Sequence, residues 1–201
     1  MKTVGIFLYN NIEVLDFAGP FEVFSTAQRI WTLAGRDPSQ ALFKVVTIAE
    51  QHKLITARGG LQVVPNHLIE YHPHIDILIV PGGIIDHQLT RAPVINWLRT
   101  TSERADLTAS VCTGAFLLAE AGLLDGCEVI THWEDSAALQ QSYPKLIVRD
   151  HARWLDQGHI VTSAGISAGI DMSLHLVSRF ASMEHAERTA HQMDYHWQQQ
   201  D

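Results

Sequence analysis

A cysteine flanked by small residues is the side chain best suited to nucleophilic chemistry in this sequence. In Ser110-Val111-Cys112-Thr113-Gly114 an apolar run ends and a stretch rich in alanine and leucine begins, which predicts a strand that turns into a helix at Cys112. Such a nucleophile elbow strains the backbone and needs small neighbours, here Ser110 and Gly114. The helix dipole should favour the thiolate and lower the thiol pKa. We expect Cys112 to be reactive, the alternative being a small buried apolar residue.

An acidic residue, Asp16, lies within the otherwise apolar stretch from Val14 to Pro20. A buried carboxylate must be hydrogen-bonded, paired with a cation or protonated, so Asp16 is a candidate partner for the thiol. It is equally a candidate cap for the helix expected to open at Gly19-Pro20. Glu13 and Glu22 are competing acids, and we expect both to face solvent.

Further candidates follow other apolar runs. Gly82 and Gly83 come after Ile75–Val80, and their N–H groups, with those of the elbow, could stabilise a developing negative charge. His132 follows a short apolar run and could activate the thiol as a base or simply fix a loop. Cys127 forms no Cys-x-x-Cys motif and is interpreted as incidental.

Nothing in the sequence indicates a cofactor or a metal. No glycine-rich dinucleotide or phosphate loop opens a helix. The 12 histidines are scattered, and those near the C-terminus lack the three- or four-residue spacing that would place two on one helical face. We expect neither a cofactor nor a metal site.

Composition limits the class of protein. The 201 residues are 46% hydrophobic and 18% charged with a net charge of −8, which predicts one globular domain over residues 1–201. The acidic balance disfavours direct nucleic-acid binding, which needs clustered Lys and Arg. Two cysteines fit a reducing compartment. No signal peptide and no apolar run of about 20 residues is seen, so we expect a cytoplasmic protein without membrane contact.

The elements that must position these residues alternate between strands and helices. Strands are expected at 4–9, 42–49, 75–80, 105–111, 128–131 and 159–163, and helices from 20 onward and at 93–104, 113–121, 133–141, 167–180 and 183–197. Residues 53–57 and 61–64 are expected to form a hairpin, and 146–149 to pair with 153–155. The alternation predicts an α/β, doubly wound, mostly parallel sheet of flavodoxin-like type with helices on both faces. Ligands of such sheets bind beyond the carboxyl ends of the strands, where the candidate residues arrive.

Taken together, these motifs resemble the ThiJ/PfpI superfamily, which is related to class I glutamine amidotransferases. The resemblance spans nearly the whole chain and rests on the opening strand, 15–20, 80–83, 110–114, 131–133 and 162–171. Two subgroups are most similar: isonitrile hydratase and the amidase-like domain of AraC-type regulators. PfpI-type peptidases carry His after the nucleophile, where this chain has Thr113, so a peptidase is not expected.

The resemblance to isonitrile hydratase implies roles for particular residues. Cys112 would attack the isonitrile carbon to form a thioimidate, Asp16 would handle the thiol proton, and Thr113 would orient substrate or water. Gly19, together with Gly82, Gly83 and His132, would bind the small-molecule substrate. The family resemblance also implies a homodimer. The alternatives are a ligand-sensing domain without catalysis, although the helix-turn-helix part of the regulators is not expected within these residues, and a thiol-based glyoxalase or redox-stress protein.

Overall fold

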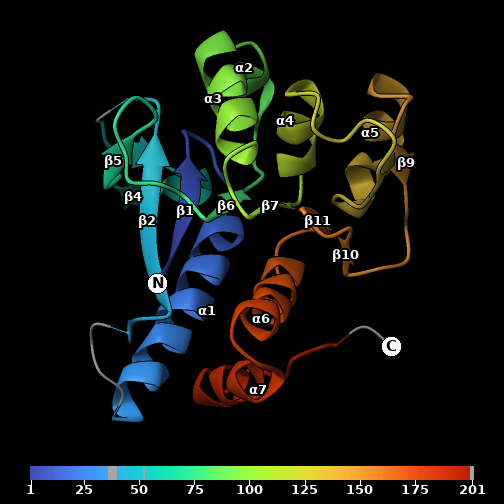
Figure 1. Cartoon of the computed structure of the whole chain (residues 1–201). Coiled ribbons are helices and arrows are strands. Elements are labelled where there is room, and N and C mark those ends of the chain that lie inside the picture. The colour runs from blue at the N-terminus through green and yellow to red at the C-terminus, as the bar shows by residue number, and fades with distance from the viewer. Residues whose placement is uncertain (36–39, 52, 200–201) are drawn as a thin grey trace.

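A seven-stranded sheet forms the centre of the computed structural model, which describes residues 1–35, 40–51 and 53–199 (Figure 1). The strand order is β10-β11-β7-β6-β1-β2-β5, and every neighbouring pair is parallel except β10 and β11. The strands are β1 (Lys2–Leu8), β2 (Phe43–Ala49), β5 (His67–Leu68), β6 (Ile77–Val80), β7 (Leu107–Val111), β10 (Trp154–Asp156) and β11 (Ile160–Ser163).

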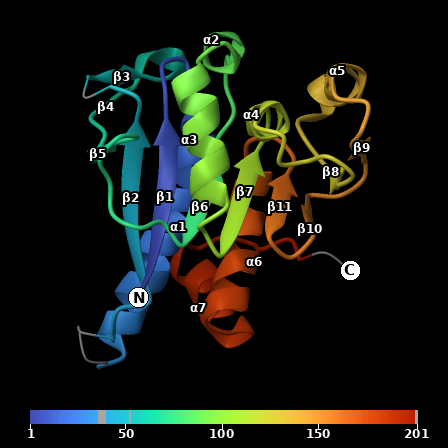
Figure 2. The same cartoon turned by 45° about the horizontal axis from the view of Figure 1, so that its top comes forward.

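Helices cover both faces of this sheet, so the predicted fold class is confirmed (Figures 1 and 2). One face carries α1 (Val14–Leu33), α6 (Ala168–Phe180) and α7 (Met183–Gln192), and the other α2 (Asp86–Leu89), α3 (Ala92–Ser102), α4 (Gly114–Glu120) and α5 (Ser136–Ser142). Burial from both sides explains why the central strands are apolar almost throughout: all four residues of β6 and all five of β7 are buried.

The first helix begins at Val14, earlier than the predicted start at Gly19-Pro20. The connection from β1 is short because Asn11 adopts a left-handed conformation (φ +64°) and Ile12 pairs with Gly83 across the sheet edge. Asp16 therefore lies in the first turn of α1, and the N-cap residue is Glu13, whose side chain makes no capping bond. Pro20 lies inside the helix, where its missing N–H leaves the carbonyl of Asp16 without the usual helical bond.

Short elements account for the other differences. The hairpin of β3 (Ile55–Thr56) and β4 (Gln62–Val63) is confirmed, with a 3-10 turn at Arg58–Gly60. The predicted pairing of 146–149 with 153–155 is wrong: β9 (Ile147–Val148) pairs with β8 (Glu128–Val129), and β10 pairs with β11. A 3-10 turn over Trp133–Asp135 precedes α5. The last helix ends at Gln192, before the expected Trp197.

None of the helices within the described ranges is long and apolar enough to span a membrane.

Candidate active site

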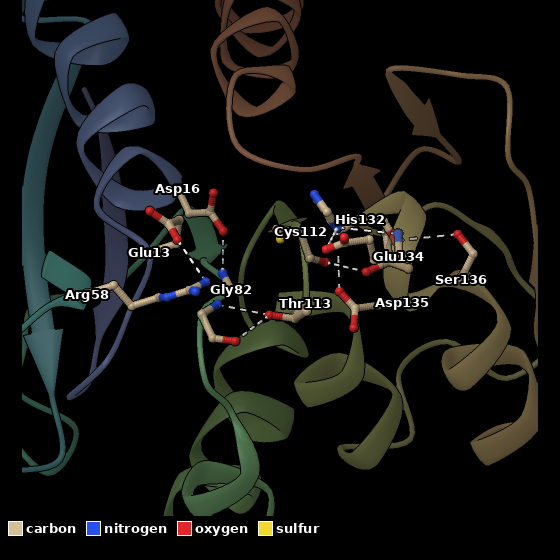
Figure 3. A network of polar contacts seen from close by, with 12 residues as sticks. Glu13, Asp16, Arg58, Gly82, Cys112, Thr113, His132, Glu134, Asp135 and Ser136 are labelled. Carbon is tan, nitrogen blue, oxygen red and sulfur yellow. Dashed lines mark hydrogen bonds and ion pairs between the residues drawn. The ribbon is translucent and has the colours of Figure 1, made fainter.

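Cys112 lies at the sharp turn between β7 and α4 and has the left-handed backbone conformation of a nucleophile elbow (φ +56°). The turn requires small neighbours, because a Cβ on Gly114 would lie 2.0 Å from the carbonyl oxygen of Val80. The Cys112 N–H donates to Ser163 O at 3.2 Å, and Thr131 Oγ1 donates to Cys112 O at 2.7 Å. The strand-to-helix turn at Cys112 is thus present, and two neighbouring segments fix it. Figure 3 shows Cys112 and Thr113 at this turn.

The Asp16 carboxyl is fully buried on the side of the cleft next to Cys112. Its Oδ2 accepts a hydrogen bond from the Gly82 N–H at 3.0 Å. Its Oδ1 is also buried, and no well-aligned hydrogen bond from a residue within the described ranges reaches it. The first turn of α1 therefore presents a carboxyl group with spare accepting capacity to the nucleophile.

The ionisation of Asp16 is shifted to neutral pH. Burial raises its pKa from 3.8 to about 7, against the hydrogen bond from Gly82, which lowers it. The nearby charge of Glu13 raises the pKa further, while interactions with the Cys112 thiol and the Ile166 N–H lower it. Near pH 7 this carboxyl can therefore both accept and return a proton.

The thiol of Cys112 is not a preformed thiolate, contrary to the prediction. Burial and the neighbouring charge of Asp16 raise its pKa from 9.0 to about 12, whereas the N–H groups of Thr113 and Ile166 lower it by less. The predicted effect of the helix N-terminus is outweighed because the side chain is only 7% exposed. A reaction at this thiol would consequently require a base to take its proton.

Two of the backbone donors expected to stabilise an oxyanion, those of Gly82 and Gly83, already have partners. The Gly82 N–H donates to Asp16, and the Gly83 N–H donates to Thr113 Oγ1 at 2.9 Å. The Thr113 hydroxyl in turn donates to Gly83 O at 3.0 Å. Thr113 and Gly83 thus form a reciprocal pair of hydrogen bonds that holds the β6–α2 connection against the elbow, and Gly82 ties the same connection to Asp16.

A cleft of about 250 Å³ opens over Cys112, and it is also lined by Thr113, Gly83, His132 and Ile166. Asp16 and Gly82 lie behind this lining. They are hydrogen-bonded to each other, and Asp16 also interacts with the Cys112 thiol. A larger cavity of about 510 Å³, lined in part by Tyr9, Leu54 and Ile84, does not include Cys112. The smaller cleft is the one that contains the candidate chemistry.

His132 faces the cleft from the segment after β8, but within the described ranges no hydrogen bond joins it to Cys112. Its Nδ1 accepts from the Glu134 N–H at 3.4 Å and lies 3.7 Å from the carboxylates of Glu134 and Asp135. Its ring packs so closely on Gly165 that a Cβ there would lie 2.1 Å from Cδ2. The structure therefore supports Asp16, rather than His132, as the base beside the thiol.

Gly19 is placed away from the cleft. It is buried in α1, where a Cβ would lie 2.9 Å from Ile170 Cγ1, so it permits close packing of α1 on α6.

Among the residues with assigned positions, no group of three His, Cys, Asp or Glu side chains is arranged to hold a metal.

Sequence reasoning missed several residues of this site. Ile166 has a left-handed conformation (φ +51°), and its N–H affects the pKa of both Asp16 and Cys112. Arg58 and Glu13 form an ion pair of 3.1 Å at one side of the cleft, whereas Glu13 was expected to face solvent. The small-residue run around Ile166 was a usable signal, but nothing local to Arg58 indicated that its hairpin reaches the cleft.

The model of the DJ-1/PfpI family matches residues 2–179. The chain belongs to the DJ-1/PfpI family. A crystal structure of a ThiJ/PfpI family protein from Pseudomonas syringae superposes with a TM-score of 0.83 at 24% identity, covering 100% of this chain and 77% of that one.

The relatives with similar sequences include both transcriptional regulators and an enzyme. The HTH-type transcriptional regulator GbdR of Pseudomonas aeruginosa is 32% identical over 179 residues, which is 89% of this chain and 46% of the regulator. The isonitrile hydratase of Pseudomonas putida is 28% identical over 193 residues, which is 96% of this chain and 78% of the enzyme. The chain thus spans about half the length of the regulators that it matches first.

Proposed function

We propose that this family member is a Cys112-dependent enzyme that adds water to a small molecule with an electrophilic carbon, most specifically an isonitrile. The observation that carries the proposal is the pairing of a buried, neutral thiol with the Asp16 carboxyl, whose pKa is about 7. Such a pair can transfer one proton during attack and needs no preformed thiolate.

The proposed first step adds the thiol across the isonitrile carbon. Asp16 takes the proton from Cys112, Sγ bonds to the carbon of R–N≡C, and the proton passes from Asp16 to that carbon, giving the thioimidate Cys–S–CH=N–R. No oxyanion forms, which agrees with the engagement of the Gly82 and Gly83 N–H groups by Asp16 and Thr113. An amidase or peptidase would need such donors free for its tetrahedral intermediate.

The second step hydrolyses this intermediate. Water adds its oxygen to the same carbon while one of its protons goes to nitrogen. The Sγ–C bond then breaks, and the remaining proton on oxygen returns to the thiol through Asp16. One isonitrile and one water thus yield one N-substituted formamide, R–NH–CHO, and the thiol and carboxyl are restored.

The test is formamide production from cyclohexyl isocyanide. Wild type and Cys127→Ala, which removes the other free cysteine, should turn over equally. Cys112→Ala should fall to background and Asp16→Asn by roughly 100-fold or more. Full turnover by Cys112→Ala would exclude the proposed nucleophile.

A second candidate function is ligand sensing without turnover. It is favoured by the 32% identity with the regulator GbdR over 89% of this chain. If wild type produces no formamide but a bound small molecule protects Cys112 from alkylation, this function replaces the first. The redox-stress alternative is less favoured, because oxidation follows thiolate character and exposure, and Cys112 has little of either.

A further inference from the structure

The cleft over Cys112 is lined by an unequal set of charges. Its negatively charged side chains are Glu13, Glu134 and Asp135, and its positively charged side chain is Arg58. Three carboxylates against one guanidinium leave an excess of two negative charges, with the thiol itself neutral.

The excess is concentrated on one wall. Glu13 and Arg58 pair at 3.1 Å and largely cancel each other. Across the cleft, Glu134 Oε2 and Asp135 Oδ2 both lie 3.7 Å from the same atom, His132 Nδ1 (Figure 3). One imidazole carries at most one positive charge, so it cannot neutralise both carboxylates. Within the described ranges, neither carboxylate has another ion-pair partner.

This negative wall acts on the reacting atom. The charge of Asp135 contributes to the raised pKa of the Cys112 thiol, after burial and Asp16. Ionisation of Asp16 behind the thiol adds to the same negative potential. The side chains of Glu134 and Asp135 are 64% and 39% exposed, so solvent and salt weaken their effect. A cleft with an excess of one sign of charge still concentrates ligands of the opposite sign.

We infer that the substrate of this cleft carries a positive charge, such as a protonated amine, on the group attached to its reacting carbon, and that anionic substrates are excluded. The electrophilic carbon faces Cys112 Sγ while the cationic group lies against Glu134 and Asp135. This inference rests on the proposed function only in taking Cys112 as the group that reacts.

The test measures the reactivity of Cys112 and does not depend on turnover. Methanethiosulfonate reagents transfer an S-alkyl group to a thiolate and release methanesulfinate. The 2-aminoethyl reagent is cationic and the 2-sulfonatoethyl reagent is anionic. Their rate ratio is measured on full-length Cys127→Ser, where Cys112 is the remaining thiol, and is divided by the ratio for N-acetylcysteinamide, a neutral thiol in solution.

The normalised ratio should favour the cation by roughly tenfold or more and should shrink as salt is raised. Glu134→Gln/Asp135→Asn should lower it by about threefold or more. The matched control, Glu103→Gln/Glu187→Gln, removes the same formal charge from exposed positions on α3's C-cap and α7 and should leave the ratio unchanged.

A wild-type ratio no higher than that of the free thiol overturns the inference, even if the double variant fails to fold. An equal fall in the control variant overturns it as well, because the effect would then be one of net charge. Absence of formamide production with the ratio intact would refute only the proposed hydration. Turnover of isonitriles without charge selectivity at Cys112 would refute only the charge inference.

Discussion

At the scale of single residues, Asp16 combines the role of base in the proposed reaction with a cost to stability. Burial raises its pKa to about 7, so near neutral pH the folded protein holds, behind the cleft, a carboxyl that can gain or lose a proton. In the unfolded chain the same group ionises near its ordinary value of 3.8. The difference makes both activity and stability depend on pH in ways that can be measured separately.

We predict that activity rises with pH through about 7, because Asp16 must be ionised to accept the thiol proton. The measurement is kcat/KM for isonitrile hydration between pH 5 and 9, since these values report the free enzyme. A flat profile over this range would argue against Asp16 as the base.

The contribution of Asp16 to the free energy of unfolding should fall as pH rises, whereas activity should increase. Because the folded-state pKa is raised, the protonated carboxyl is favoured on folding, and its contribution is lost as pH rises from about 4 to about 7. Each tenfold change in an acid constant is worth about 1.4 kcal/mol, so the cost above pH 7 is on the order of 4 kcal/mol. Urea unfolding should show Asp16→Asn gaining stability relative to wild type over this range and levelling off above it.

At the scale of elements, the contact between the β6–α2 connection and the elbow sets the geometry of the site. A Cβ on Gly82 would lie 2.6 Å from both Thr113 N and Thr113 Oγ1 and 2.9 Å from Asp16 Oδ2. Those atoms belong to two segments, the elbow and the first turn of α1, so none can shift without moving the residue next to Cys112 or the Asp16 carboxyl. Close approach, rather than turn conformation, is why glycine is needed here.

Gly82→Ala is therefore expected to lower turnover by roughly 10-fold to 100-fold, as small displacements of reacting groups do. Gly126→Ala is the control, because Gly126 has a left-handed φ of +79° but open space around it. It should lose about 1 kcal/mol of stability to backbone strain and keep full turnover. Equal turnover in the two variants would contradict the proposed role of this contact.

The same elements show what the sequence can and cannot predict. The apolar runs that became β1, β6 and β7 and the small residues around Cys112 carry local signals, so the sheet and the elbow could be predicted. The start of α1 at Val14 could not, because it depends on Ile12 pairing with Gly83, far away in the sequence. The raised thiol pKa is likewise a result of burial in the folded chain, which no motif encodes.

At the scale of the whole molecule, Asp171 joins three parts of the structure. It is fully buried in α6, and its Oδ2 accepts from Arg153 Nε at 2.6 Å, just before β10. Its Oδ1 accepts from the Gln198 N–H at 2.9 Å, and its carbonyl accepts from Trp197 Nε1 at 3.2 Å. The segment after α7 is therefore held against the helix that begins near the active site.

Asp171→Asn should destabilise the protein by about 3 kcal/mol, because it breaks a pair whose acidic member is fully buried. Asp125→Asn, which breaks the exposed pair with Lys145, should cost less than about 1 kcal/mol. Urea unfolding at pH 7.5 compares the two. Equal losses in the free energy of unfolding would show that the buried contacts of Asp171 stabilise the protein no more than an exposed ion pair does.

The left-handed conformation of residue 112 also limits how such a protein can diverge. Branched side chains such as Val, Ile or Thr are disfavoured at φ +56°, although the surrounding structure holds Ile166 at φ +51°. Gly and Asn adopt this conformation most readily. A lineage that gives up chemistry can therefore replace the cysteine in one step without rebuilding the fold, and can regain it the same way. Under the proposed function, catalysis is then lost through a change at residue 112 alone, while the turn beneath it is inherited unchanged.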